Sequence, residues 1–134
     1  YFGRRSPSWA FENKRMEYED IPHNASPEKL SLDDTTPLEE KVKGLLGLVL
    51  YGKDYELAME KSLEFSSSSD NMIKGCAFIS FGHLARIHRK LDLDRVIPVF
   101  KANQHIEDSV LRGKMEDAIS DITFFLKVEE GLFR

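Results

Sequence analysis

The sequence predicts an all-α protein, and two features of the chain support this fold class. The segments 70–75 and 108–113, which lie 38 residues apart, share one pattern: an acid, a small polar residue, two apolar residues, a base and a glycine. A period near forty is typical of helical hairpins that bury their apolar faces by stacking on one another. Alternation of apolar and polar residues never persists beyond four residues, so no β-strand is predicted.

The chain has 134 residues, which suits a single domain with a core of useful size. We divide it into an N-terminal arm, 1–36, and a helical body, 37–134. The arm contains three prolines and no sustained helical period, so at most one short helix is expected near 8–18, with a linker near 22–36. Its large apolar residues are too many for a free tail. We therefore expect the arm to pack on the body, with Trp9 as its main anchor.

The body is expected to begin with a helix over 37–51. Thr36 is a good N-cap, and Pro37 suits the first helical position. Glu39 and Glu40 fall in the first turn, where the helix dipole favours acids. The apolar stripe of this helix is Leu38, Val42, Leu45, Leu46, Val49 and Leu50.

Two hairpins, each with a short and a long helix, are predicted to follow. The first pairs 55–66 with 70–90, and the second pairs 93–105 with 108–129. Pro98 lies inside its predicted helix and should kink it or shift its start. Because the long helices carry the repeated pattern, we expect them to lie side by side and parallel. Aspartates open three of the four helices: Asp54, Asp70 and Asp92. The stripes of the long helices are Ile73, Ala77, Phe81, Leu84, Ile87 and Leu91, and then Leu111, Met115, Ala118, Ile119, Ile122, Phe125 and Leu126.

The start of both long helices, polar and then apolar, apolar, basic and small, resembles the second helix of HEAT-like repeats over about 80 of the 134 residues. This resemblance implies a short HEAT-like α-solenoid of about five helices with the N-terminal arm packed on it, and such stacks usually serve as binding surfaces. The alanine-rich midsection of regular HEAT units is replaced here by 78–81 and 116–119, so a less regular stack is expected.

No constellation of catalytic or metal-binding residues is found in the sequence, so no enzymatic activity, cofactor or metal is expected. A helical zinc site needs two histidines at i and i+4, whereas His83 and His88 are five apart and diverge by about 140° on a helix. For His83 we expect a solvated or hydrogen-bonded structural role. The single cysteine, Cys76, is expected to be a small buried filler, which fits a reducing cytoplasmic location. No apolar run approaches the ~18 residues that span a membrane.

The candidate binding residues are acids. Residues 31–70 hold nine acids against four bases. Like charges at i and i+4 slightly destabilise a helix, so an acidic ridge kept despite that cost can serve as a docking face for a basic partner; a solvated helix face is the simpler alternative. Paired carboxylates could also perform acid–base chemistry, but only in a cleft, and we expect these acids to be exposed. The candidates are Glu56, Glu60 and Glu64 on the second predicted helix of the body, and Glu116, Asp117 and Asp121 on the last one.

A small acidic all-α chain with a degenerate HEAT-like pair resembles bacterial immunity proteins of contact-dependent growth inhibition and related polymorphic-toxin systems. The resemblance implies a cytoplasmic protein that forms a one-to-one complex with a cognate toxin, often a nuclease, and covers its active site. An acidic surface would complement the basic cleft of a nuclease.

Two alternatives remain open. One is a HEAT-like scaffold or adaptor that binds an endogenous protein. The other is a nucleic-acid-binding or repair protein, which would require a basic groove, whereas the net charge of −4 argues weakly against nucleic acid as a direct partner. The sequence indicates no membrane partner and does not determine the oligomeric state.

Overall fold

A computed structural model describes residues 37–134 of the chain, and this part is all-helical, as predicted, with no strand among the described residues. The expectations for the arm, including the anchor role of Trp9 and the short helix near 8–18, lie outside the described residues. A short 3₁₀ helix, η3 (Glu130–Phe133), follows the last α-helix. The α-helices are α2 (Leu38–Tyr51), α3 (Tyr55–Ser66), α4 (Asn71–His88), α5 (Leu93–Ala102) and α6 (Ser109–Leu126).

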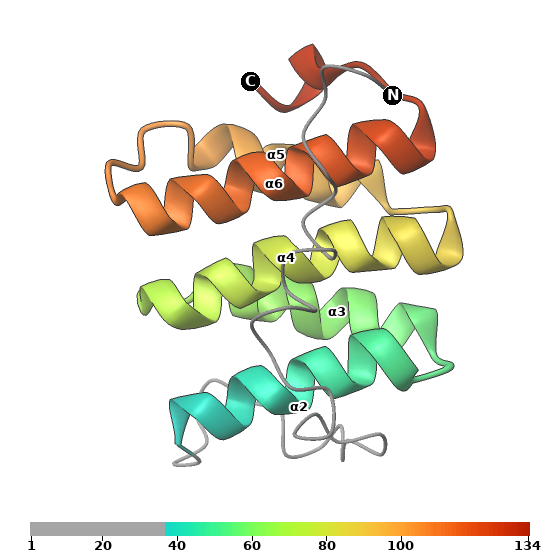
Figure 1. Ribbon diagram of the computed structural model, residues 1–134, viewed down its shortest axis with the longest axis vertical. Helices are drawn as coiled ribbons and strands as arrows, with labels where there is room; N and C mark the ends of the chain where they lie inside the picture. The colour runs from blue at the N-terminus through green and yellow to red at the C-terminus, as the bar shows by residue number, and fades with distance from the viewer. Residues whose placement is uncertain (1–36) are drawn as a thin grey trace.

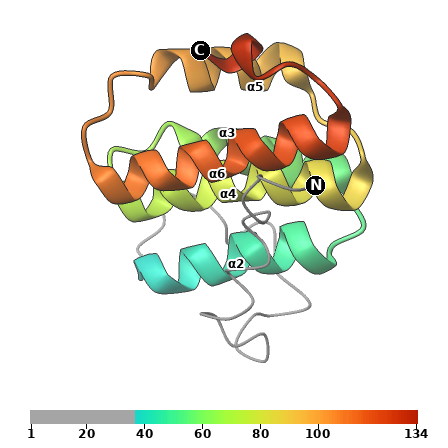
Figure 2. The ribbon, with the colours of Figure 1, turned by 45° about the horizontal axis from the view of Figure 1, so that its top comes forward.

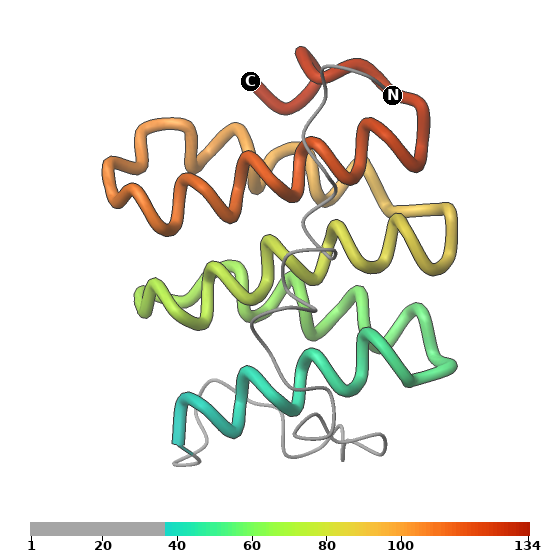
Figure 3. Tube along the Cα trace, viewed as in Figure 1, coloured from blue at the N-terminus to red at the C-terminus, as the bar shows by residue number. Residues whose placement is uncertain are grey.

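The helices form two layers. Helices α2, α4 and α6 lie side by side in one layer and run in the same direction, while α3 and α5 lie behind them and run the opposite way (Figure 1). The turned view in Figure 2 keeps this separation, and the tube in Figure 3 shows the chain crossing from one layer to the other at each connection. The N-terminal ends of the three parallel helices therefore share one edge of the molecule, and their C-terminal ends share the opposite edge.

Aspartates start three of the helices by capping them. Asp54 Oδ1 accepts a hydrogen bond from the Leu57 amide at 3.0 Å, and Asp70 and Asp108 cap α4 and α6 in the same way. Asp92 precedes α5 but makes no such cap. Because each cap satisfies an amide that the helix itself leaves unpaired, the helix starts follow from the sequence.

Several helix boundaries differ from the prediction. Helix α2 begins one residue late, at Leu38, with Pro37 as its N-cap. Helices α4 and α6 end two and three residues early, because Arg89 and Lys127 adopt the left-handed conformation with φ of 55° and 57° and close the last turn. Helix α5 is also shorter than predicted, and it contains Pro98, which has no amide hydrogen to donate.

The core centres on α4, which is buried almost all round because α2, α3 and α6 all pack on it. Ile73, Ala77 and Leu84 of α4 join Leu111 and Ile122 of α6 in one continuous cluster, as predicted. Ile87 is an exception to the predicted stripe: it is the penultimate residue of α4, beyond this packing, and remains 37% exposed.

Two glycines of α4 fix its alignment with α6. A Cβ atom on Gly75 would lie 2.7 Å from Lys114 Cδ, and one on Gly82 would lie 3.0 Å from Asp121 Oδ2. Both pairs are 39 residues apart, one more than the 38-residue repeat, so the two helices run parallel, as predicted, in nearly the register of the repeat. Gly113, the equivalent of Gly75 in the second copy of the pattern, meets nothing within 4 Å.

The segment after α6 returns to close the second hairpin. The ring of Phe133 is fully buried and packs edge-on against Phe100, 5.5 Å between centroids, while Phe100 stacks on Phe78 at 5.3 Å. Gln104 Nε2 donates to the Phe133 carbonyl oxygen at 2.9 Å. Among the described residues, no helix combines the length and the apolar character needed to cross a membrane.

Candidate protein-binding surface

Helix α3 presents the first predicted acidic ridge to solvent. Its inward face carries Ala58, Met59 and Phe65, all buried. The glutamates lie on the opposite face: the side chains of Glu56 and Glu60 are 72% and 60% exposed, and that of Glu64 is 37% exposed. The expectation of exposure is therefore confirmed for Glu56 and Glu60, whereas Glu64 is only partly exposed. We call Glu56, Glu60 and Glu64 the α3 ridge.

Arg95 of α5 links two glutamates of the α3 ridge, Glu56 and Glu60, to the neighbouring helix. Its Nη1 lies 2.5 Å from Glu60 Oε1, its Nη2 lies 3.9 Å from Glu56 Oε2, and its Nε donates to Asp92 Oδ2 at 2.5 Å. The hydrogen bonds to Glu60 and Asp92 raise the pKa of Arg95 above its usual value, so the guanidinium stays charged. The glutamate side chains are thus oriented rather than free to sweep the solvent.

The α3 ridge keeps an excess of negative charge despite this arginine. Its three carboxylates and that of Asp92 face Arg95 and Lys61, whose Nζ lies 3.5 Å from Glu64 Oε1. The four carboxylates therefore outnumber these two cations by two. An exposed surface of this kind attracts a basic protein and orients it during encounter.

The second predicted acidic set, on α6, is arranged differently. The carboxylate of Glu116 pairs with two arginines. Both of its oxygens accept hydrogen bonds from Arg134 at 2.6 Å, and its Oε2 lies 3.4 Å from Arg112 Nη1. The hydrogen bonds to Glu116 and Glu130 raise the pKa of Arg134. This cluster therefore fixes the segment after α6 to that helix, so Glu116 has a structural role.

Asp121 corrects the expectation that the α6 acids are exposed. It is only 1% exposed, because it lies at the seam between α4 and α6 against Gly82, where the absence of a side chain leaves room for a carboxylate. Asp117 is partly buried on the same helix. The α6 acids therefore form no continuous solvated ridge comparable with that of α3.

His83 of α4 is fully buried, and its Nδ1 has no hydrogen-bond partner within residues 37–134. The expected solvated or hydrogen-bonded role is therefore wrong for this nitrogen. Burial, with a smaller effect of Arg86, lowers the pKa of His83 to about 3, so the ring is neutral at physiological pH. No group of three or more His, Cys, Asp and Glu side chains in the described part of the chain is placed to hold a metal ion.

Cys76 is buried, as expected for a filler, with its Sγ 3.8 Å from the Val42 carbonyl oxygen. The feature of this surface that sequence reasoning missed is Arg95, which reaches a glutamate 35 residues away. The only local signal was a base three residues after the helix-opening Asp92. The chain matches no protein-family model, no curated protein and no solved structure.

Proposed function

We propose that this protein binds a partner protein with a basic surface through the α3 ridge. In this proposal the partner is a toxin, with a nuclease as the leading candidate, and this chain neutralises it as a cytoplasmic immunity protein. The observation that carries the proposal is the exposure of Glu56 and Glu60, whose carboxylates Arg95 orients. Oriented acids lose less conformational freedom when a basic partner docks than mobile ones would.

The arrangement of helices supports a finer proposal for the fold. A layer of parallel helices backed by antiparallel ones is what a short HEAT-like α-solenoid would contain, and the 38-residue repeat supplies two of its units. Such a stack offers a rigid, extended face, so it suits a protein that covers the active site of another.

The test begins with capture of the partner by the tagged chain in its native host, followed by association-rate measurements with that purified partner. Replacing Glu56→Lys and Glu60→Lys together should slow association at least tenfold at low salt, and the difference should shrink as salt rises, because exposed charges act mainly on encounter. The matched control, Glu39→Lys with Glu40→Lys on α2, reverses the same number of exposed charges elsewhere and should leave the rate within about threefold.

In-cell protection distinguishes the two kinds of partner. If the captured protein is toxic when produced alone and the parent chain prevents this, the immunity role is supported. A partner that is harmless by itself would favour the scaffold or adaptor role instead. A partner that binds the ridge-reversed variant as fast as the parent would remove the α3 ridge from the interface altogether.

A further inference from the structure

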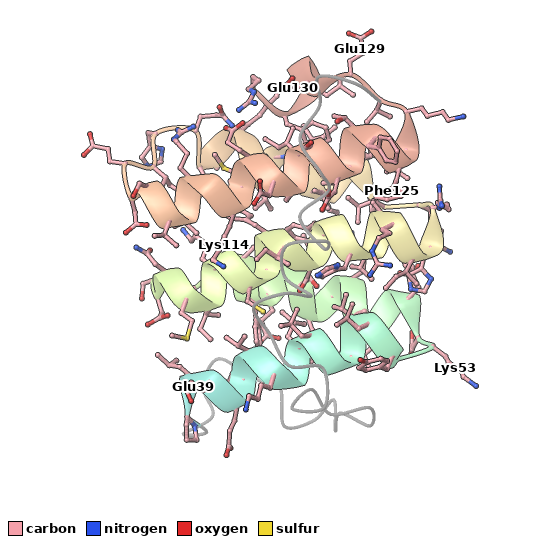
Figure 4. All side chains as sticks on the ribbon, viewed as in Figure 1. Glu39, Lys53, Lys114, Phe125, Glu129 and Glu130 are labelled. Atoms are coloured by element: carbon pink, nitrogen blue, oxygen red, sulfur yellow. The ribbon has the colours of Figure 1, made fainter. Side chains whose placement is uncertain are left out.

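The C-terminal ends of α2, α4 and α6 meet at one edge of the parallel layer, where Figure 4 labels Lys53 and Phe125. Basic residues collect at this edge. We call the following four residues, all exposed, the basic edge: Lys53, Arg89, Lys90 and Lys127.

The basic edge differs from Arg95, Arg112 and Arg134 in its ion pairs. Arg95, Arg112 and Arg134 each form ion pairs with acids, whereas none of the basic-edge residues makes an ion pair within 37–134. The pKa of His88, which directly precedes Arg89, is lowered, first by burial and then by the charge of Lys90.

Two residues of this edge occupy a conformation that their type disfavours. Arg89 and Lys127 are the only non-glycine residues in the described part of the chain with positive φ, and they lie 38 residues apart, at equivalent positions of the repeat. Glycine is the usual residue at such a helix end, because a side chain strains the left-handed conformation. The backbone conformation alone therefore favours glycine at both positions, yet both carry a long cationic side chain.

Aromatic rings lie among these cations. The Arg89 guanidinium lies 4.9 Å from the centroid of the Phe125 ring, and Lys90 Nζ lies 4.3 Å from that of Tyr55. Phe124 packs edge-on against Phe125, 4.8 Å between centroids. The rings position the cations without cancelling their charge.

We propose that the basic edge binds the phosphate backbone of single-stranded nucleic acid, without regard to sequence. Arg89 and Lys127 occupy equivalent positions on neighbouring helices, whose axes pack about 8–10 Å apart. They therefore present spaced positive charges to a ligand whose backbone carries spaced negative charges. Cations interleaved with aromatic rings are the combination that single-strand-binding surfaces use. An acidic protein segment would be bound by the cations alone and would leave the aromatic rings without a role. The inference does not depend on the α3 ridge and goes beyond the proposed function.

The test measures binding of a fluorescent 20-nucleotide oligothymidylate to the full chain by anisotropy. With about three phosphates contacted, affinity should fall about 20-fold between 50 and 200 mM salt. Replacing Arg89→Gly and Lys127→Gly removes two charges and relieves both strained positions, so binding should weaken at least tenfold while the melting temperature does not fall. The control pair Lys43→Ala and Lys101→Ala neutralises two exposed lysines outside the basic edge and should change affinity less than twofold.

Any of three results would overturn the proposal: no binding at 50 mM salt, equal weakening in the control pair, or full binding by the glycine pair. Tighter binding of a 20-residue polyglutamate than of the oligonucleotide would reassign the edge to an acidic protein. The α3 ridge variant Glu56→Lys/Glu60→Lys should bind the oligonucleotide at least as well as the parent, so failure of this proposal and failure of the toxin-binding proposal give different results.

Discussion

Gly82 of α4 faces the buried carboxylate of Asp121 on α6 so closely that a Cβ atom at position 82 would lie 3.0 Å from Asp121 Oδ2 and 3.3 Å from its Cβ. The seam between the two long helices is therefore built around the absence of one side chain. A mid-helix glycine costs stability relative to alanine, and here that cost is offset by room for a polar group between the helices.

Alanine substitution should separate the two roles of glycine in the long helices. Gly82→Ala should destabilise the protein by about 1 kcal/mol, because the clash in a tightly packed seam exceeds the gain in helix propensity. Gly113→Ala, whose Cβ would meet nothing within 4 Å, should stabilise it by about 0.5–1 kcal/mol. Urea denaturation measures both changes, and the same sign for the two variants would refute this account of the seam.

Core truncation should be costly at the positions where α4 and α6 share one cluster. Leu84→Ala or Ile122→Ala should each lower the free energy of unfolding by about 2–5 kcal/mol, since both side chains are completely buried. Ile87→Ala, at the exposed end of the same stripe, serves as the control and should cost less than about 1 kcal/mol. Equal losses at positions 84 and 87 would show that the burial pattern is incorrect.

Relief of backbone strain should be visible at the end of α6. Lys127→Gly should raise the free energy of unfolding by up to about 1 kcal/mol, because glycine adopts positive φ without steric cost. Lys127→Ala keeps a Cβ and should show no such gain. Thermal melts of the two variants provide the comparison, and a glycine variant less stable than the alanine variant would rule out strain at this position.

The buried His83 should make stability depend on pH. Its pKa is lowered to about 3 in the folded state from a usual value near 6.5, so the unfolded chain binds the additional proton between these values. Stability from this group is fully present above pH 6.5 and falls as pH decreases toward 3, by at most about 1.4 kcal/mol per pH unit. Unfolding free energies at pH 7.5 and 5.5 should therefore differ more for the parent than for His83→Leu. Identical differences in both proteins would mean that His83 does not titrate on unfolding.

The sequence was sufficient for the helices and for the pairing of α4 with α6. Asp54, Asp70 and Asp92 located three helix starts, although Asp92 makes no side-chain cap. The repeat at Asp70 and Asp108 predicted the parallel alignment, because equivalent residues occupy equivalent positions in stacked hairpins. Helix ends were predicted less well, since Arg89 and Lys127 adopt the left-handed conformation without being glycine. No local pattern distinguishes such residues from ones that continue a helix.

Only part of the candidate surface could be predicted from the sequence. Exposure of the α3 ridge followed from its spacing, but burial of Asp121 did not, because polar residues at helical spacing usually indicate a solvated face. The available signal was Gly82: an isolated glycine within a helix often marks a close approach. The reach of Arg95 to Glu60 depends on how α5 packs beside α3, which is a tertiary relationship that spacing along the chain does not encode.

The parallel layer also gives the molecule an electrical orientation. Acids cap or flank the starts of its helices, among them Glu39, Asp70 and Asp108, while Arg89 and Lys127 lie at the opposite edge. These full charges exceed the half-charges of the helix dipoles that they face, so by themselves they give the layer a moment that runs from acidic starts to basic ends. In the field of a highly charged partner the protein would experience a torque and would turn before contact. A polyanion would thus meet the basic edge first, even from a random initial approach.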